Sequence, residues 1–318
     1  MKHNLPVTLI LIGVFVLSQV VGLFLVGESL ESVTCEDDNV TCTPAYEDTI
    51  VGERPETEGA GSLAYILIGV GIGTGLLLLI AKYGKVGIWR TWFFIAIVLA
   101  TTIALGVVLH PLAAFIVALV LAAWKMWRPN LIVYNVAEVL MYSGIAVLLV
   151  PILNVFWMII LLALISVYDM IAVWKSKHMV TMAQFITGSN AFAGLVVPYD
   201  GKKGVSMRLP KQAQTSKKGV KKASKGGVKS AILGGGDITF PLLFSGVVLQ
   251  ERVASLVGQG VVFQQALAQG FGVSLLVSLG ATAAVAWLFF AAKKDRFYPA
   301  MPFISVGCLA GWVLTFLF

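Results

Sequence analysis

The sequence predicts an all-helical, polytopic membrane protein. Of its 318 residues, 58% are hydrophobic and only 12% are charged, and the mean hydropathy is +0.90. A soluble domain carries about 25% charged residues and needs them to cover its surface. The apolar residues also gather in stretches of about 20, the length at which a helix crosses the hydrocarbon core. These observations exclude a soluble globular protein. The distribution of the net charge of +7 argues against a nucleic-acid-binding protein.

We expect nine membrane-spanning helices. The first is an uncleaved anchor rather than a signal peptide, because its apolar run is as long as a full span and lacks a small-x-small cleavage site. The fourth is short and begins at the His110-Pro111 turn. The predicted spans cover residues 5–26, 61–81, 91–109, 111–124, 131–150, 152–174, 231–250, 266–292 and 300–318. The chain then divides into an N-terminal bundle (1–174), a connector (175–230) and a C-terminal bundle (231–318).

The connector, residues 175–230, is expected to be cytoplasmic. Its first part, through Val197, is fairly apolar and is expected to extend the sixth span or to lie on the membrane surface. Its second part combines many Lys with Gly and Ser, a composition that cannot bury a core and indicates a flexible segment. A polybasic segment of this kind can also contact anionic lipid headgroups.

The positive charges predict the orientation of the chain. All but two of the 23 Lys and Arg lie before the first span or in loops that follow an even-numbered span. Cytoplasmic loops are enriched in these residues, so the N-terminus is expected in the cytoplasm and the C-terminus outside. The loop 28–60, with ten Asp and Glu, is then external and is interpreted as a solvated acidic loop.

The cysteines predict neither a disulfide scaffold nor a metal site. Cys35 and Cys42 share the external loop and could pair there if that space is oxidising. Cys308 lies in an apolar run and is interpreted as a packing residue. No C-x-x-C motif and no His/Cys cluster occurs, so no metal and no other cofactor is expected.

Three acidic residues lie within the predicted spans: Glu138, Asp169 and Asp237. A carboxylate near mid-bilayer costs about 2.5–3.5 kcal/mol on insertion scales, so a functional role is the first hypothesis. Asp169 lies six residues before Lys175, near the cytoplasmic end of the sixth span. Asp237 lies eight residues after Lys229, near the cytoplasmic start of the seventh. Because these spans are antiparallel neighbours, both aspartates are expected at a similar depth.

Two carboxyl groups at one depth predict acid–base chemistry. Held close together they cannot both ionise cheaply, so they share one proton. The ionised group can take a proton from water while the protonated group donates to the oxygen of a scissile carbonyl. An ion pair is the structural alternative, but no predicted span contains a Lys or Arg. The pair therefore predicts peptide hydrolysis without a covalent intermediate.

Glycines and prolines flank the predicted site. Three glycines, Gly234, Gly235 and Gly236, precede Asp237, weaken a helix and leave backbone exposed for an extended substrate. Close helix packing is the alternative reading of such residues, and it suits the four glycines of the second span better. Those glycines are Gly69, Gly71, Gly73 and Gly75. The two prolines of Pro299-Ala300-Met301-Pro302 predict an irregular start to the last span.

Three of these segments resemble motifs of the presenilin and signal peptide peptidase family, the Gly-x-Gly-Asp intramembrane aspartyl proteases. Ile165-Ser166-Val167-Tyr168-Asp169 resembles the Tyr-Asp motif, and Leu233-Gly234-Gly235-Gly236-Asp237 is similar to Leu-Gly-x-Gly-Asp. Pro299-Ala300-Met301 is similar to Pro-Ala-Leu, with Met in place of Leu. The three segments occur in the family's order, on the sixth, seventh and ninth predicted spans, and the resemblance is strongest from the sixth span onward.

The resemblance implies a presenilin-like fold with Asp169 and Asp237 as the catalytic residues. It also implies that Tyr168 lies beside them and that Gly234 and Gly236 shape the cleft, with Gly235 at the variable position. Pro299, Ala300 and Met301 are implied to position the substrate. The predicted orientation matches that of presenilin, so the implied substrates are single-span proteins with the N-terminus outside. Whether the chain acts alone or as a homo-oligomer is left open.

Glu138 is a possible supporting residue. It lies in the fifth predicted span, and Asn135, three residues earlier, can share its helix face. Structural hydrogen bonding is favoured over a proton relay.

The main alternative function is an ion-coupled secondary transporter, which also places buried acids beside glycine-broken helices. An inverted repeat would favour it, and the two halves of the chain show none. A prepilin peptidase also uses Gly-x-Gly-Asp, but its motif context and span count fit less well.

Overall fold

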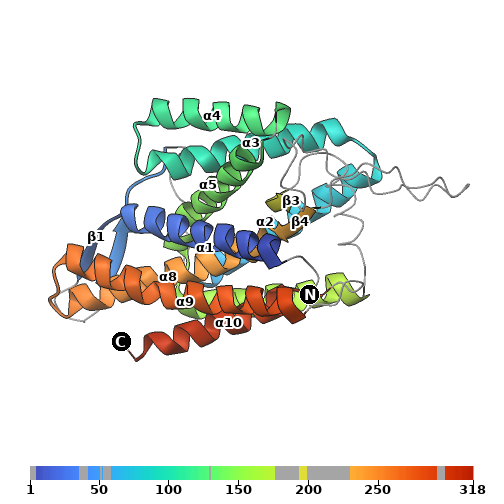
Figure 1. Cartoon of the computed structure of the whole chain (residues 1–318). Coiled ribbons are helices and arrows are strands. Elements are labelled where there is room, and N and C mark those ends of the chain that lie inside the picture. Colours follow the sequence, from blue (N-terminus) through green and yellow to red (C-terminus); the bar gives the residue numbers. More distant parts are fainter. Residues whose placement is uncertain are drawn as a thin grey trace, which may run out of the picture.

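The computed structural model describes residues 5–35, 42–50, 52, 59–128, 130–175, 193–198, 230–291 and 298–317. Within them the fold is a bundle of nine α-helices with two small hairpins towards its opposite ends (Figure 1). The helices are α1 (Leu5–Glu28), α2 (Ala60–Lys82), α3 (Val86–Gly106), α4 (Pro111–Trp127), α5 (Leu131–Leu149), α6 (Val155–Met170), α8 (Gly236–Gly258), α9 (Phe263–Ala291) and α10 (Met301–Thr315). Each predicted span overlaps one of these helices, so the predicted helical membrane fold is confirmed.

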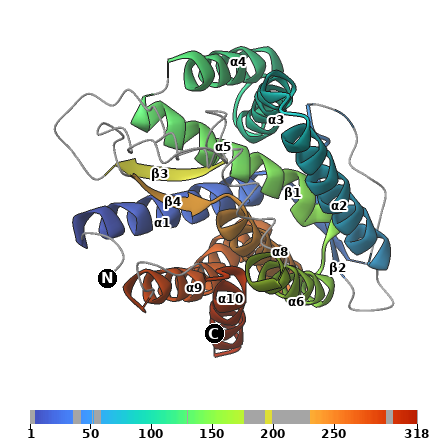
Figure 2. The same ribbon diagram turned by 90° about the vertical axis from the view of Figure 1, so that its right-hand side faces the viewer.

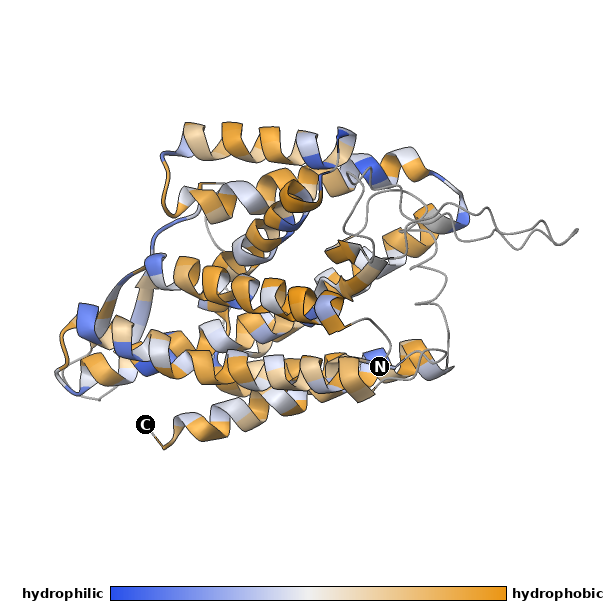
Figure 3. Ribbon diagram, in the orientation of Figure 1, coloured by the Kyte–Doolittle hydropathy of each residue, from blue (hydrophilic) through white to orange (hydrophobic). Residues whose placement is uncertain are grey.

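The outer surface of the bundle is apolar. Seven of the described helices are long and apolar enough to cross a membrane, while α4 and α10 are shorter, at 17 and 15 residues. Figure 3 shows hydrophobic residues along the lengths of the helices and hydrophilic residues mainly towards their ends. Ile68 and Leu112, for example, are 60% and 68% exposed. Apolar surface on this scale is stable in lipid and not in water.

Several helices begin at residues that favour a helix N-terminus. Pro111 is the first residue of α4, where its missing N–H costs nothing. The Asn130 side chain accepts a hydrogen bond from the backbone N–H of Ile132 and caps α5. The Asn154 Oδ1 does the same for α6, accepting from the N–H of Trp157 at 3.0 Å. A short 3₁₀ turn, η1 (Val150–Ile152), joins α5 to α6, and a π-helical turn, η2 (Ile171–Lys175), follows α6.

The segment before Asp237 is a strand, so the prediction of a span from residue 231 was wrong there. Residues Ser230–Gly234 form β4, and α8 begins only at Gly236 and continues to Gly258. Ala231 and Leu233 are buried while Ile232 and Gly234 are less so, an alternation typical of a strand. Asp237 therefore lies in the first turn of its helix, and the depth estimated by counting helical residues from Lys229 does not hold.

The apolar start of the connector also differs from its prediction. Residues Gly194–Pro198 form β3, which pairs antiparallel with β4, instead of extending the sixth span or lying on a surface. Leu195, Val196 and Val197 are at most 3% exposed, because the hairpin lies between α1 and α5 (Figure 2). Most of the predicted connector, including its Lys-rich part, lies outside the described residues.

A second hairpin lies at the other end of the bundle. Strands β1 (Leu30–Cys35) and β2 (Cys42–Tyr46) pair antiparallel, and a disulfide joins Cys35 to Cys42. The Tyr46 hydroxyl donates to Gln250 Oε1 at 2.7 Å, which ties the hairpin to the far end of α8. Cys308 is a buried free cysteine in α10, as predicted from its apolar surroundings.

Glycines pack helices together in both bundles, for example Gly144 of α5 against the backbone of Ala100 on α3. Helices α9 and α10 touch along Gly280, Gly307 and Gly311, where an added Cβ would lie 2.2–2.4 Å from a facing carbonyl oxygen. The glycines of α2 have nothing within 4 Å of that position, so the packing role expected for them was wrong. Helix α2 lies at the outside of the bundle and makes few contacts with it (Figure 2).

Candidate active site

Asp169 comes from the end of α6 and faces the start of α10. It is 7% exposed, and its Oδ2 accepts a hydrogen bond from the backbone N–H of Met301 at 3.1 Å. Met301 is the first residue of α10, so the carboxylate meets the unpaired N–H groups and positive dipole of a helix N-terminus. One turn earlier on α6, the Ser166 hydroxyl lies 2.9 Å from that of Ser305, which fastens α6 to α10 beside the acid.

Asp237 reaches the site from the corner between β4 and α8. It is half-buried and lies in the first turn of α8, another position where a helix favours negative charge. Its carboxylate lies beside Gly234, the last residue of β4. A Cβ atom at Gly234 would lie 3.2 Å from Asp237 Oδ2, so a larger residue would crowd the carboxylate.

The two carboxylates lie close enough to interact electrostatically. In the described part of the chain neither aspartate forms an ion pair. Two acids that lie close together without a cation favour a state in which the pair holds one proton. The catalytic role expected for both aspartates stays a prediction.

A long-range contact holds the first turn of α8. Pro241 lies inside this helix and has no N–H, so the backbone carbonyl of Asp237, four residues earlier, lacks its usual donor within the helix. The Gln19 Nε2 of α1 donates to the carbonyl oxygen of Ile238 at 3.0 Å, and the side chain is fully buried. Nothing in the sequence pattern of α1 indicated that Gln19 would approach the site.

Comparison with family models gives a match over residues 12–318 to "Signal-peptide peptidase, presenilin aspartyl protease". The chain belongs to this family. It is thus an integral membrane aspartic endopeptidase that cleaves transmembrane substrates within the membrane.

Two solved structures share the fold. Both are described as a presenilin family intramembrane aspartate protease, one in space group C222 and one in P2. The first matches with a TM-score of 0.54 at 17% identity over 98% of each chain. The second matches with a TM-score of 0.53 at 17% identity over 99% of this chain and 98% of that one. Comparison with curated protein sequences gives no significant match.

The other predicted site residues of the protease differ in how they lie relative to the aspartates. Met301 reaches Asp169 through its backbone, while its side chain is 4% exposed and packs in the core. Pro299 and Ala300 immediately precede α10, with Ala300 as its capping residue. Tyr168 is adjacent to Asp169 in sequence but is 39% exposed.

The glycines before Asp237 also differ among themselves. Gly235 is in contact with Tyr142 of α5, because a Cβ atom at Gly235 would lie 2.6 Å from the Tyr142 hydroxyl. Gly236 has more room, with Phe240 at 3.7 Å from the same position. The identity of the residue at Gly235 is therefore restricted by α5.

The structure contains a buried cation that the sequence did not indicate. Lys125 was assigned to the loop between the fourth and fifth spans, but it lies in the last turn of α4 and is 3% exposed. It forms an ion pair with Glu138 of α5. Glu138 is therefore neutralised by a partner, unlike the two aspartates. The spacing of Lys125 and Glu138 along the chain carries no signal that could have revealed the pair.

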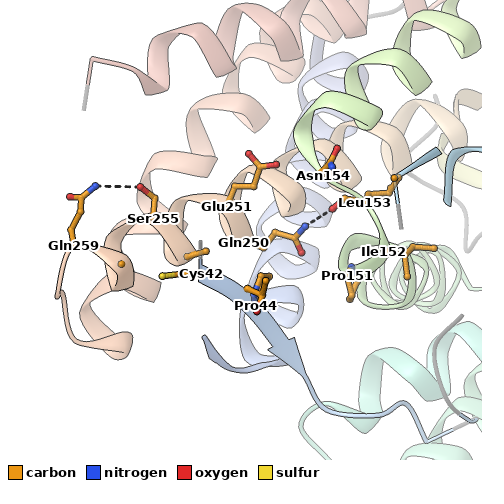
Figure 4. Close-up of a pocket in the computed structure, with 14 residues that line it drawn as sticks. Cys42, Pro44, Pro151, Ile152, Leu153, Asn154, Gln250, Glu251, Ser255 and Gln259 are labelled. Carbon is orange, nitrogen blue, oxygen red and sulfur yellow. Dashed lines mark hydrogen bonds between the residues drawn. The ribbon is translucent and has the colours of Figure 1, made fainter. Parts of the chain in front are cut away.

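A cavity of about 860 Å³ lies at the opposite end of α8 and is separate from the aspartates. Figure 4 shows it between η1, β2 and the last turns of α8. Its walls are tied together by Gln250, which donates to the carbonyl of Leu153, and by Glu251, whose Oε1 accepts from the N–H of Val155 at 2.7 Å. Glu251 lies 14 residues beyond Asp237, roughly 20 Å along the helix, so this cavity is no part of the candidate site.

Proposed function

We propose that this protease hydrolyses peptide bonds within single-span membrane proteins, with Asp169 and Asp237 as an acid–base pair that activates water. The observation that carries the proposal is the meeting of two uncompensated carboxylates, one at the start of α10 and one in the first turn of α8. A structural pair of acids would be expected to have a cation beside it, as Glu138 has.

The reaction needs only these two groups and a water molecule. The ionised carboxylate takes a proton from water as the water oxygen attacks the scissile carbonyl carbon. The protonated carboxyl group donates its proton to the carbonyl oxygen, which gives a neutral tetrahedral intermediate. When the C–N bond breaks, the leaving nitrogen receives the proton held by the pair. A hydroxyl group of the intermediate gives its proton to the other aspartate as the carboxyl product forms, so the pair again holds one proton. No covalent enzyme intermediate and no cofactor is required.

The edge of β4 offers a place for the substrate backbone. The backbone N–H and C=O of Val196 in β3 are both bound by the side chain of Asn135, at 3.1 and 3.0 Å. Val196 pairs with Ile232, so in an antiparallel ladder the N–H and C=O of Ile232 point to the other edge of β4. The backbone groups of Gly234 point to the same edge, beside the Asp237 carboxylate. The backbone of a substrate strand that pairs with this edge would extend towards the aspartates.

This arrangement gives each remaining predicted residue a role. Gly234 and Gly236 keep the approach to Asp237 free of side chains, and the Pro299–Met301 segment holds Asp169 through the backbone of Met301. The exposed ring of Tyr168 is proposed to contact the substrate next to Asp169. The charge bias of the loops supports a cytoplasmic N-terminus, and hence substrates whose N-terminus lies outside. Contact of the Lys-rich connector with anionic lipid remains part of this proposal.

The proposal is tested by substituting each aspartate in the purified protein. Asp169→Ala and Asp237→Ala should each lower cleavage of a single-span reporter peptide at least about a hundredfold, the usual contribution of a general acid or base. Products are measured by mass spectrometry, and thermal unfolding in detergent checks that both variants fold. Glu251→Gln is the matched control, since it neutralises an acid on α8 at the far end of the helix.

Binding of a hydroxyl-containing mimic of the tetrahedral intermediate gives a second measurement. A protease should bind such a mimic more tightly than the substrate peptide, and both aspartate variants should lose this preference. Full activity in either folded variant would rule out the acid–base pair. A transporter would bind the mimic no better than the substrate and would yield no peptide products.

A further inference from the structure

A buried lysine sits at the junction of three helices. The Lys125 ammonium pairs with Glu138 and lies 4.9 Å from the ring centre of Phe93 on α3 and 4.5 Å from that of Tyr134 on α5. Taking two charges out of water is expensive, and a well-packed apolar pair is often at least as stable. Stability alone therefore explains the ion pair poorly. The other groups that Glu138 binds suggest a different role for it.

Glu138 binds three groups from three directions. Lys125 contacts its Oε1, while its Oε2 accepts from the Tyr142 hydroxyl one turn further along α5. The same Oε2 accepts from the backbone N–H of Gly194 at 2.8 Å. Gly194 is the first residue of β3, so the carboxylate fixes the strand at its start. Asn135, on the same helix face, holds the strand again at Val196, two residues later.

These contacts lead directly to the residues before Asp237. Gly194 is paired with Gly234 in the hairpin, and Gly234 lies against the Asp237 carboxylate, whose Oδ2 would be 3.2 Å from a Cβ atom there. The Tyr142 ring packs against Gly235, with no room for a Cβ atom between them. The cluster of Lys125, Glu138 and Tyr142 thus holds both the strand opposite Gly234 and the corner at Gly235.

We propose that Lys125, Glu138 and Tyr142 form a positioning cluster that sets the place of Asp237 relative to Asp169. None of the three is a catalytic residue, because they act through β3 and the glycines and not on the substrate. Lys125 holds one oxygen of Glu138, so that the other oxygen can accept from both Tyr142 and Gly194. The proposal rests on the proposed function, since it assumes that Asp237 reacts.

Two charge-neutral double variants isolate the contact to Gly194. Lys125→Met with Glu138→Gln keeps an oxygen that can accept from the Gly194 N–H, whereas Lys125→Met with Glu138→Leu removes it. Neither leaves an unpaired charge in the membrane. We expect kcat of the Leu variant to be about tenfold below that of the Gln variant, with KM within about threefold, since the buried N–H loses its partner.

A second variant and a control address folding. Asn135→Leu removes both bonds to Val196 and should also lower kcat. It tests the proposal even if the Leu double variant does not fold. Ser143→Ala is the matched control on α5, because the Ser143 hydroxyl bonds only the carbonyl of Val139 in its own helix among the described residues. It should leave kcat unchanged.

The outcomes separate this proposal from the proposed function. If the wild-type protein does not cleave the reporter, or if Asp237→Ala does not affect cleavage, the proposed function is wrong. That failure is distinct from a failure of the positioning role. With an active wild type, equal kcat values near the wild-type level for the Gln and Leu variants would overturn the positioning role. Equally low values for both would indicate a proton relay through Glu138 instead, because Gln cannot pass a proton. A change confined to KM would assign the cluster to substrate binding.

Discussion

The two aspartates reach the candidate site by different routes. Asp169 is held from far along the chain, by the N–H of Met301, 132 residues away. Asp237 is held mostly by what precedes it, a strand, a glycine corner and the first turn of its own helix. One half of the site thus depends on how α10 docks against α6, and the other on how β4 turns into α8.

The difference predicts which of the two aspartates is affected by a substitution elsewhere in the chain. Movement of α10 would take the helix N-terminus away from Asp169 without touching Asp237. Loosening of α1 or α5 would act on Asp237 through Ile238 or the hairpin without touching Asp169. Substitutions remote from both carboxylates can therefore be assigned to one half or the other.

The largest effect is expected from Gly311→Ala, on the Asp169 side. The added methyl group would lie 2.4 Å from the carbonyl oxygen of Leu276, and backbone on α9 cannot move aside as a side chain could. Overpacking of this kind costs about 1–3 kcal/mol in stability, and a shift of α10 should also lower cleavage. Thermal unfolding in detergent measures the first effect and peptide cleavage the second.

Gly73→Ala is the matched control for that substitution. Nothing lies within 4 Å of the added methyl group on α2, and alanine favours a helix over glycine. The control should be at least as stable as the wild type. If both variants unfold at the same temperature, the close approach of α9 and α10 is not what positions α10.

A smaller effect is expected from Gln19→Leu, on the Asp237 side. The substitution removes the donor to the carbonyl of Ile238 but also the buried Gln19 Oε1, which has no hydrogen-bond partner among the described residues. These two changes oppose each other, so stability should change by less than about 1 kcal/mol. The turn that carries Asp237 loses its support, and kcat should fall several-fold.

Ser18→Ala provides the comparison for Gln19→Leu. Ser18 is equally buried next to it on α1, but its hydroxyl bonds the carbonyl of Phe15 in its own helix. Its loss should leave kcat unchanged. Equal kcat for both variants and the wild type would show that Gln19 does not support Asp237.

Much of the fold could be predicted because lipid imposes a simple rule on the sequence. Long apolar stretches must be helices, so the number and approximate bounds of the spans could be read from composition. The acids within them stood out for the same reason. The strands β3 and β4 could not be predicted, since a short apolar run next to a span looks the same as one more helical turn.

Pairings between distant residues were equally hidden. Lys125 looked like a loop residue because a lysine near a helix end usually extends to the interface, and only the fold reveals that Glu138 draws it inward. For the glycines of α2, the sequence suggested a contact that the structure does not contain. A regular row in α2 suggested packing, whereas glycines that do pack helices, such as Gly280, Gly307 and Gly311, lie on two helices and match only in space.

The smallest effect concerns the hydroxyl pair that joins α6 to α10. Ser166→Ala and Ser305→Ala each remove one side of the 2.9 Å contact, and the double variant removes both. Hydrogen bonds between membrane helices contribute about 0.6 kcal/mol on average, so unfolding in detergent should give a coupling energy of this size. Because the pair lies one turn from Asp169, kcat should fall by less than about threefold, equally in all three variants. A coupling energy of zero would mean that α10 is positioned by the glycine contacts with α9 alone, and Gly311→Ala would then account for the whole dependence of Asp169 on α10.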